Sequence, residues 1–178
     1  MKTTGFTLFL ALFFVGCGDD TDSTPADNSA TSEIAMGCQH LTYGPDVSLD
    51  LSSEVGAAST IHTRYTVQLA SADSGASGAF VWTSAGGHHY FLFNHATTVT
   101  VTQDGTEVAA VASHSAPVSD CADATSVYEF MLPEGSYEVA IASSEPEVFM
   151  AIHKAGQTHD HGHDHGDHHD DEHGDHDH

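Results

Sequence analysis

The residues best suited to chemistry are concentrated at the C-terminal end of the chain. Nine histidines and eight carboxylates lie within residues 159–178, and every second residue from 159 to 165 is a histidine. Imidazole nitrogen suits zinc, nickel and copper(II), and neighbouring carboxylates can accept hydrogen bonds from the ring N–H groups. The spacing predicts several exchangeable sites for zinc, with nickel or copper as alternatives. The expected ligands are His159, His161, His163, His165, His168, His169, His173, His176 and His178.

This tail cannot bury a core, so residues 155–178 are expected to be disordered. Because only neutral imidazole binds metal, the number of metal ions that the tail can hold should fall in acidic surroundings. The tail resembles the His-Asp-Gly-rich segments of zinc-uptake binding proteins, cation-diffusion transporters and nickel chaperones. The resemblance covers the tail alone and implies that it gathers or buffers ions beside a separate structured site.

Seven further histidines precede the tail and are candidates for that second site. His89 and His95 would share one strand face, but six residues at roughly 3.3 Å each put them about 20 Å apart, too far to bind one ion together. Each would need partners from another segment, and the sequence leaves open which of them converge. The candidates are His40, His62, His88, His89, His95, His114 and His153.

The N-terminal residues predict export from the cytoplasm. Lys2 precedes an apolar run over residues 6–15 that is too short for a permanent membrane helix, so residues 1–16 are interpreted as a signal peptide. Gly16 and Cys17 follow it and resemble the lipobox of bacterial lipoproteins, which implies lipid attachment at Cys17. Residues 17–35 are then a lipidated, flexible tether. The expected location is the cell envelope, on the outer membrane facing the periplasm or the cell surface.

The charge of the chain narrows the classes of partner. The sequence has 26 acidic residues against three Lys and Arg, for a net charge of −23 at pH 7. Such a surface repels phosphate backbones, so no nucleic acid partner is expected. Metal ions and, through the lipid anchor, a membrane are the expected partners, with a metal transporter as a further candidate.

Two cysteines remain once Cys17 is assigned to lipid. In an oxidising compartment Cys38 and Cys121 are expected to form a disulfide. The alternative is that Cys38 and His40 act together as metal ligands, because thiolate and imidazole both suit zinc or copper.

The middle of the chain, residues 36–154, alternates apolar and polar residues in short runs without a helical period. In residues 61–69 every second residue is predicted to face the core. Asp104-Gly105 predicts a tight hairpin turn between residues 98–102 and 106–111, and residues 133–135 predict a second turn between 127–132 and 136–141. A last strand is expected over 147–153. The fold class is therefore all-β, a single antiparallel β-sandwich or jelly roll of about eight or nine strands.

Residues 130–139 resemble the late strands of pre-peptidase C-terminal type β-sandwiches, which implies architecture and no activity. We expect a lipoprotein that captures or buffers zinc-like ions at the envelope and delivers them to a transporter. The alternative is a carbohydrate- or protein-interaction module that uses Trp82, Tyr90, Phe91 and Phe93, although core packing is the more common use of such rings. No sequence motif of a metallohydrolase or serine hydrolase occurs, so no enzyme is expected.

Overall fold

A computed structural model describes residues 28–157, which form one helix and nine strands. These elements are α1 (Asn28–Tyr43), β1 (Asp46–Leu51), β2 (Gly56–Ala58), β3 (Arg64–Ala72), β4 (Gly75–Phe93), β5 (Thr97–Gln103), β6 (Thr106–Val108), β7 (Ala112–Ser115), β8 (Ser126–Ser143) and β9 (Glu147–Lys154). The prediction of an all-β fold with about nine strands is confirmed for this part of the chain.

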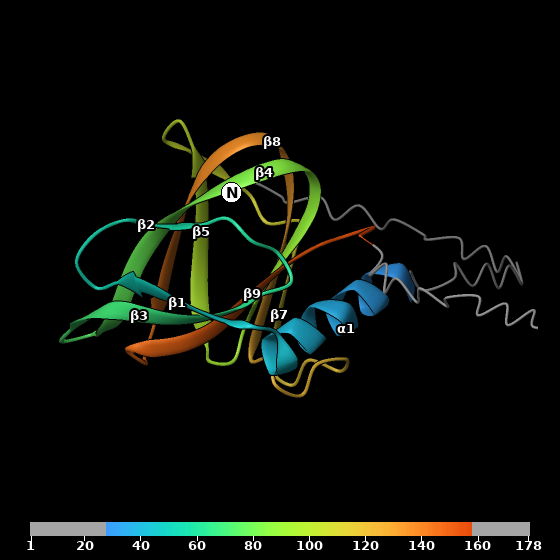
Figure 1. The fold of residues 1–178 in the computed structure, drawn as a ribbon, viewed down its shortest axis with the longest axis horizontal. Coiled ribbons are helices and arrows are strands. Elements are labelled where there is room, and N and C mark those ends of the chain that lie inside the picture. The colour runs from blue at the N-terminus through green and yellow to red at the C-terminus, as the bar shows by residue number, and fades with distance from the viewer. Residues whose placement is uncertain (1–27, 158–178) are drawn as a thin grey trace, which may run out of the picture.

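The nine strands form one curved sheet in the order β1-β3-β9-β4-β8-β5-β6, with β2 added to β4 and β7 added to β8 (Figure 1). Most pairs are antiparallel, as predicted, but β1 pairs with β3 and β2 pairs with β4 in parallel. The sheet is therefore mixed, and it is not closed. Helix α1 packs on its outer side near β9 and β4.

Two long strands, β4 and β8, give the sheet its curvature. They pair in one continuous register from Ala76–Ser143 to Phe93–Ser126, in which Gly86 and Pro133 fall opposite each other without forming a ladder pair. Gly86 and Gly87 have φ values of 83° and 109°, which favour glycine, and Pro133 has no N–H to donate to a ladder. The predicted turn over residues 133–135 is wrong, because these residues bend a continuous strand where the opposite strand also bends.

The predicted hairpin at Asp104-Gly105 is confirmed. Both residues have positive φ values, 51° and 76°, and they join β5 to β6. Strand β6 ends at Val108, earlier than the predicted residue 111. The predicted last strand is also confirmed as β9.

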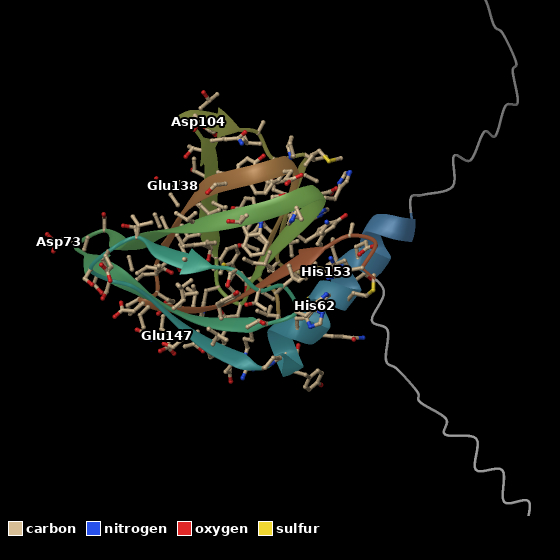
Figure 2. The ribbon with its side chains drawn as sticks, turned by 45° about the horizontal axis from the view of Figure 1, so that its top comes forward. His62, Asp73, Asp104, Glu138, Glu147 and His153 are labelled. Atoms are coloured by element: carbon tan, nitrogen blue, oxygen red, sulfur yellow. A yellow bond between two sulfur atoms is a disulfide. The ribbon has the colours of Figure 1, made fainter. Side chains whose placement is uncertain are left out.

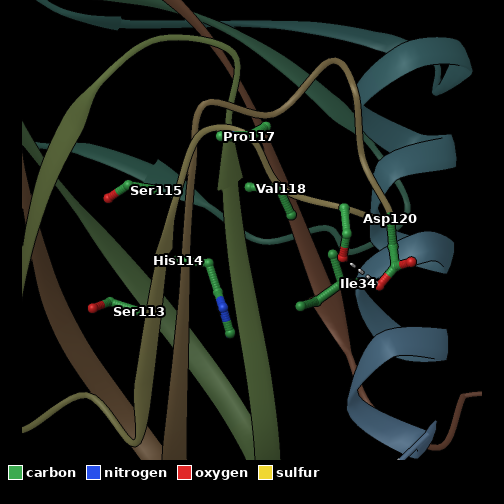
Figure 3. A pocket seen from close by; sticks show the side chains of 8 residues that line it. Ile34, Ser113, His114, Ser115, Pro117, Val118 and Asp120 are labelled. Carbon is green, nitrogen blue, oxygen red and sulfur yellow. Dashed lines mark hydrogen bonds between the residues drawn. The ribbon is translucent and has the colours of Figure 1, made fainter.

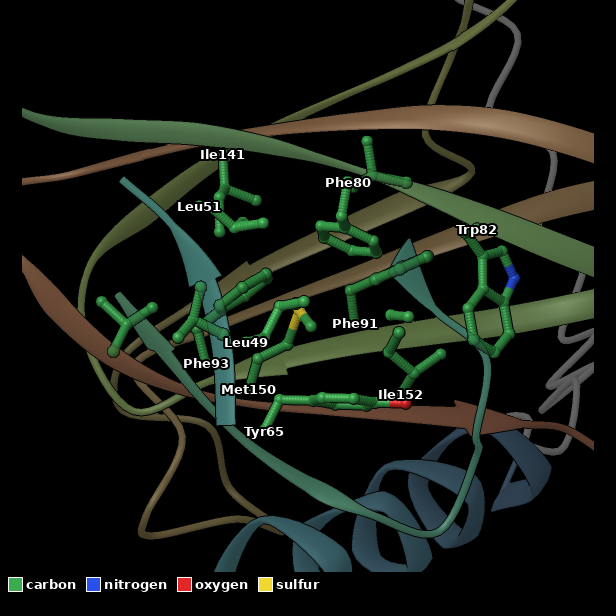
Figure 4. Close-up of a cluster of buried hydrophobic side chains, with 14 of the residues drawn as sticks. Leu49, Leu51, Tyr65, Phe80, Trp82, Phe91, Phe93, Ile141, Met150 and Ile152 are labelled. Carbon is green, nitrogen blue, oxygen red and sulfur yellow. The ribbon is translucent and has the colours of Figure 1, made fainter. Parts of the chain in front are cut away.

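The main core lies inside the curve of the sheet (Figure 4). The alternation predicted for residues 61–69 is confirmed within β3, where Tyr65, Val67 and Leu69 are buried and the residues between them are partly exposed, whereas residues 61–63 precede the strand. The four rings considered as a binding face are all buried, with exposed fractions of 3% or less: Trp82, Tyr90, Phe91 and Phe93. They therefore do not form a surface for carbohydrate or protein.

Helix α1 was not predicted, and the folded part of the chain begins before residue 36. Ile34, Cys38 and Leu41 recur at helical spacing and pack with Tyr90 and Leu92 in a second core cluster on the outer face of the sheet. The predicted Cys38–Cys121 disulfide is confirmed, with 5.4 Å between Cα atoms, and it joins the unpredicted helix to the loop after β7. Within residues 28–157, α1 is too short and too polar to cross a membrane.

Candidate metal centre

Three of the seven candidate histidines converge beside α1: His40, His62 and His153. One nitrogen from each ring lies within 4.8 Å of the others. The three residues come from α1, from the loop between β2 and β3, and from β9. Figure 2 shows His62 and His153 next to the helix. The fold therefore gathers three imidazoles from segments that are far apart in the sequence.

Hydrogen bonds fix which ring nitrogens face one another. His62 Nε2 lies 3.2 Å from Oε1 of Gln157, so we assign its proton to Nε2. His62 Nδ1 is then an acceptor, and it lies 2.7 Å from His40 Nε2, which donates to it when no ion is bound. This arrangement aims a lone pair of His62 into the cluster.

His153 is oriented by a carboxylate from the helix. Its ring is completely buried, and its Nε2 donates to Glu33 Oε2 at 2.6 Å. The nitrogen with which His153 can bind an ion is therefore Nδ1. A metal-bound histidine typically donates its other N–H to a carboxylate or carbonyl group, which fixes the tautomer and raises ligand basicity. Glu33 and Gln157 supply this kind of support to His153 and His62.

The position of His62 depends on an unusual backbone conformation. Its φ value of 62° lies in the left-handed region, which costs free energy for a residue other than glycine. Arg64 holds the adjoining segment, because it donates to the Thr42 carbonyl at the end of α1 and to both oxygens of Asp46. The loop is thereby fixed to the helix that carries His40.

Glycine allows the helix to approach the sheet closely enough to complete the cluster. A Cβ atom on Gly37 would lie 2.7 Å from Leu92 Cδ1 and 3.1 Å from His153 Cβ. Glu33, Gly37 and His40 follow one another at intervals of four and three residues, so they share the helix face that meets β9 and β4.

The donor set suits a transition-metal ion. Zinc binds imidazole nitrogen at about 2.0–2.1 Å, so two nitrogens of a tetrahedral site lie roughly 3.3 Å apart. The separations in the cluster, from 2.7 Å for His40–His62 up to 4.8 Å at most, bracket that value. Small side-chain rotations would therefore let the three nitrogens hold one ion. Three neutral imidazoles favour zinc, copper(II) or nickel over calcium or magnesium.

The other four candidate histidines lie apart from this cluster. His88 bonds to Glu129, with 2.6 Å between Nδ1 and Oε1, and His95 is exposed in a loop. His89 is buried in the sheet, where burial lowers the pKa of its imidazole despite a bond to the Gly87 carbonyl. His114 lines a surface pocket of about 420 Å³ near Ile34 (Figure 3).

The disulfide decides between the two hypotheses for the cysteines. Cys38 is bonded to Cys121 and is therefore not a thiolate ligand, whereas His40 does belong to the cluster. The nine tail histidines, Cys17 and the signal peptide lie outside the described residues.

Sequence reasoning missed Glu33 and Gln157 because it placed both in flexible segments. A signal for Glu33 was present, since Glu33-Gly37-His40 and Ile34-Cys38-Leu41 both have helical spacing. No comparable signal exists for Gln157, whose role depends on where β9 ends. No family model and no curated protein matches this chain.

Proposed function

We propose that this protein binds transition-metal ions, with zinc as the principal ion, at a structured three-histidine site and along its histidine-rich tail. The observation that carries the proposal is the convergence of His40, His62 and His153, with Glu33 and Gln157 on the outer nitrogens of two of the rings. Binding, rather than catalysis, accounts for the many imidazoles in one chain.

The wider role that we propose is capture and buffering of ions at the cell envelope. Attachment through Cys17 would keep the protein at a membrane, and delivery to a metal transporter would give the captured ion a destination. The Cys38–Cys121 disulfide supports an oxidising compartment. The strongly acidic composition supports attraction of cations.

Competitive zinc titration of full-length variants tests both binding elements. In the tail variant all nine histidines of residues 159–178 are replaced by Gln. His62→Asn removes one ligand of the structured site while keeping a residue type that tolerates a positive φ. The matched control is His95→Asn, which alters an exposed histidine outside the cluster.

The tail variant should lose most zinc equivalents and retain one. Adding His62→Asn to it should weaken that remaining equivalent by at least about tenfold, since removing even an outer partner of a ligand typically costs 10–100-fold. The control should leave binding unchanged. Equal zinc uptake by the intact protein and the tail variant would refute the role of the tail. Unchanged binding after His62→Asn would refute the structured site.

A further inference from the structure

Helix α1 supplies two of the groups that build the candidate metal centre. His40 is one of the three candidate ligands, and Glu33 orients the ring of His153 through a 2.6 Å hydrogen bond. Cys38 lies between Glu33 and His40 on this helix and forms the disulfide with Cys121. The disulfide is therefore a covalent link between the rest of the fold and the part of α1 that builds the site.

The other half of the disulfide belongs to the loop between β7 and β8, which is firmly bonded to the sheet. The N–H of Cys121 donates to the Val118 carbonyl at 3.1 Å, and the N–H of Thr125 donates to the Phe93 carbonyl at 2.7 Å. Figure 3 shows this loop beside α1, where Val118 and Ile34 belong to one core cluster. The disulfide thus holds the helix to a fixed point of the fold.

Polar contacts between α1 and its neighbours are concentrated at the C-terminal end of the helix. The Thr42 carbonyl accepts from Arg64 at 3.1 Å, and the Thr42 hydroxyl donates to Asp123 at 2.6 Å in a position exposed to water. A helix of sixteen residues is only marginally stable in water by itself. Without the disulfide, the turn around Glu33 would depend on the apolar contacts of Ile34 and on the bonds of Glu33 itself.

We propose that the Cys38–Cys121 disulfide controls how tightly the site holds its ion: the disulfide form binds the ion, and reduction by thiols releases it. The proposal rests on the proposed function and adds a regulator to the same site. Once the disulfide is broken, α1 can move away from the sheet and take His40 and Glu33 out of the site. Coupling between two equilibria is reciprocal, so a bound ion makes the disulfide harder to reduce by the same factor.

Two thiol molecules supply the electrons for this reduction. Cys38 is partly exposed, whereas Cys121 is 1% exposed, so the first thiolate is expected to attack the Cys38 sulfur. A bond forms between these two sulfurs, the Cys38–Cys121 bond breaks, and the departing Cys121 thiolate takes up a proton. The second thiolate attacks the reductant sulfur of this mixed disulfide, and Cys38 leaves as a thiolate that also takes up a proton. The protein gains two electrons and two protons, and the two thiols become one disulfide.

Competitive zinc titration of the full-length tail variant, with and without Cys38→Ser and Cys121→Ser, tests the effect on affinity. All proteins carry Cys17→Ser, so that no other thiol is present. The double serine variant should bind zinc at the structured site about tenfold or more weakly, as is typical when a ligand loses its support. Amide hydrogen exchange should become faster in α1, while β4 and β8 keep their protection.

A redox titration tests the reciprocal effect in the tail variant that retains Cys38 and Cys121. The protein is equilibrated with mixtures of reduced and oxidised glutathione, a chelator holds free zinc constant, and thiol labelling measures the reduced fraction. Saturating zinc should raise the ratio of squared glutathione to glutathione disulfide at half-reduction by about tenfold or more. The matched control carries His62→Asn, which removes a ligand outside α1 and leaves the disulfide in place. The control should show no shift.

Equal zinc affinity with and without the disulfide would overturn this inference and leave the proposed function standing. A zinc-induced shift towards easier reduction would do the same, because it would mean that the free thiolates bind zinc better than the disulfide form does. Loss of exchange protection throughout the sheet would show that the whole domain unfolds, and would also overturn the inference. A disulfide form of the tail variant that binds no zinc would overturn both.

Discussion

Glu33 joins the candidate metal centre to helix α1 and to the segment that follows β9. One carboxylate oxygen accepts from His153 and the other accepts from the backbone of Gly156, while the residue itself belongs to α1. Its side chain is only 16% exposed, so the bond to the buried imidazole is weakly screened by water. The carboxylate holds the His153 ring in one tautomer and one orientation, which should favour binding of an ion through the other ring nitrogen.

The substitution Glu33→Gln should weaken zinc binding at the structured site by about tenfold or more, because it removes the negative charge beside His153. The amide oxygen of Gln can still accept the hydrogen bond from the ring. Competitive titration in the tail variant measures this affinity without the tail histidines. Glu54→Gln, at an exposed carboxylate, is the matched control. An affinity equal to that of the control would show that Glu33 does not tune the site.

His89 should make the free energy of unfolding depend on pH. This dependence should be present even when no metal ion is bound. Burial lowers the pKa of its imidazole below the ordinary value of 6.5, so the unfolded chain takes up a proton at a higher pH than the folded protein does. Stability should therefore fall as pH drops below about 6.5, by at most about 1.4 kcal/mol per pH unit for this one proton. The loss should stop once the pH passes the lowered pKa of the folded state.

The measurement is urea unfolding at several pH values between 7.5 and 5, with EDTA present to remove metal. His89→Phe keeps a ring in this buried position but removes the titrating group. The variant should lose less stability than the intact protein across this range. Parallel pH curves for the two proteins would show that His89 does not contribute.

At the scale of elements, the contact between α1 and the sheet sets the geometry of the site. Gly37→Ala would ordinarily favour a helix, but its new Cβ would press on Leu92 and on His153 Cβ. Overpacking of this kind costs about 1–3 kcal/mol. We expect the variant to be less stable and to bind zinc more weakly, because the helix carrying His40 is displaced from β9.

Chemical denaturation and zinc titration of the same samples measure both effects. Gln39→Ala is the control, because it changes an exposed position of the same helix without adding contacts to the sheet. A Gly37→Ala protein with raised stability and unchanged zinc affinity would mean that the helix lies farther from the sheet than the structure indicates.

Patterns of neighbouring residues predicted the elements that depend on local sequence. They missed the elements that depend on contacts between residues far apart in the chain. The strand alternation of β3 and the Asp104-Gly105 turn are properties of neighbouring residues, so the sequence alone was sufficient. The bend of β4 and β8 needs Gly86 and Pro133 to lie opposite each other, and strand register is a long-range property. The same limit applies to the site: its three histidines were candidates, but their convergence depends on pairing of His153 with Tyr90 and on docking of α1.

At the scale of the whole molecule, the site connects parts of the fold that are distant in the chain. Its three candidate ligands lie at positions 40, 62 and 153, so the unfolded chain does not hold them together. An ion that binds only the folded state stabilises it, by about 2.7 kcal/mol when the free ion concentration is one hundred times the Kd.

Zinc should therefore raise the Tm of the tail variant, and EDTA should reverse the increase. The same variant carrying His62→Asn should show a much smaller shift. Differential scanning calorimetry at several zinc concentrations provides the measurement. A Tm that does not respond to zinc in the tail variant would contradict an ion site built by folding.

The bond between Glu33 and Gly156 also fixes where the two chain ends leave the domain. Because it ties the first half of α1 to the segment after β9, the two ends of the described residues lie near each other, beside the candidate metal centre. If Cys17 is anchored in a membrane, eleven residue steps lead from it to Asn28 and five helical steps lead on to Glu33, so the site stays within about 45 Å of the lipid surface. In the proposed envelope role, the length of this tether would limit how far from the membrane the candidate metal centre can meet an acceptor protein.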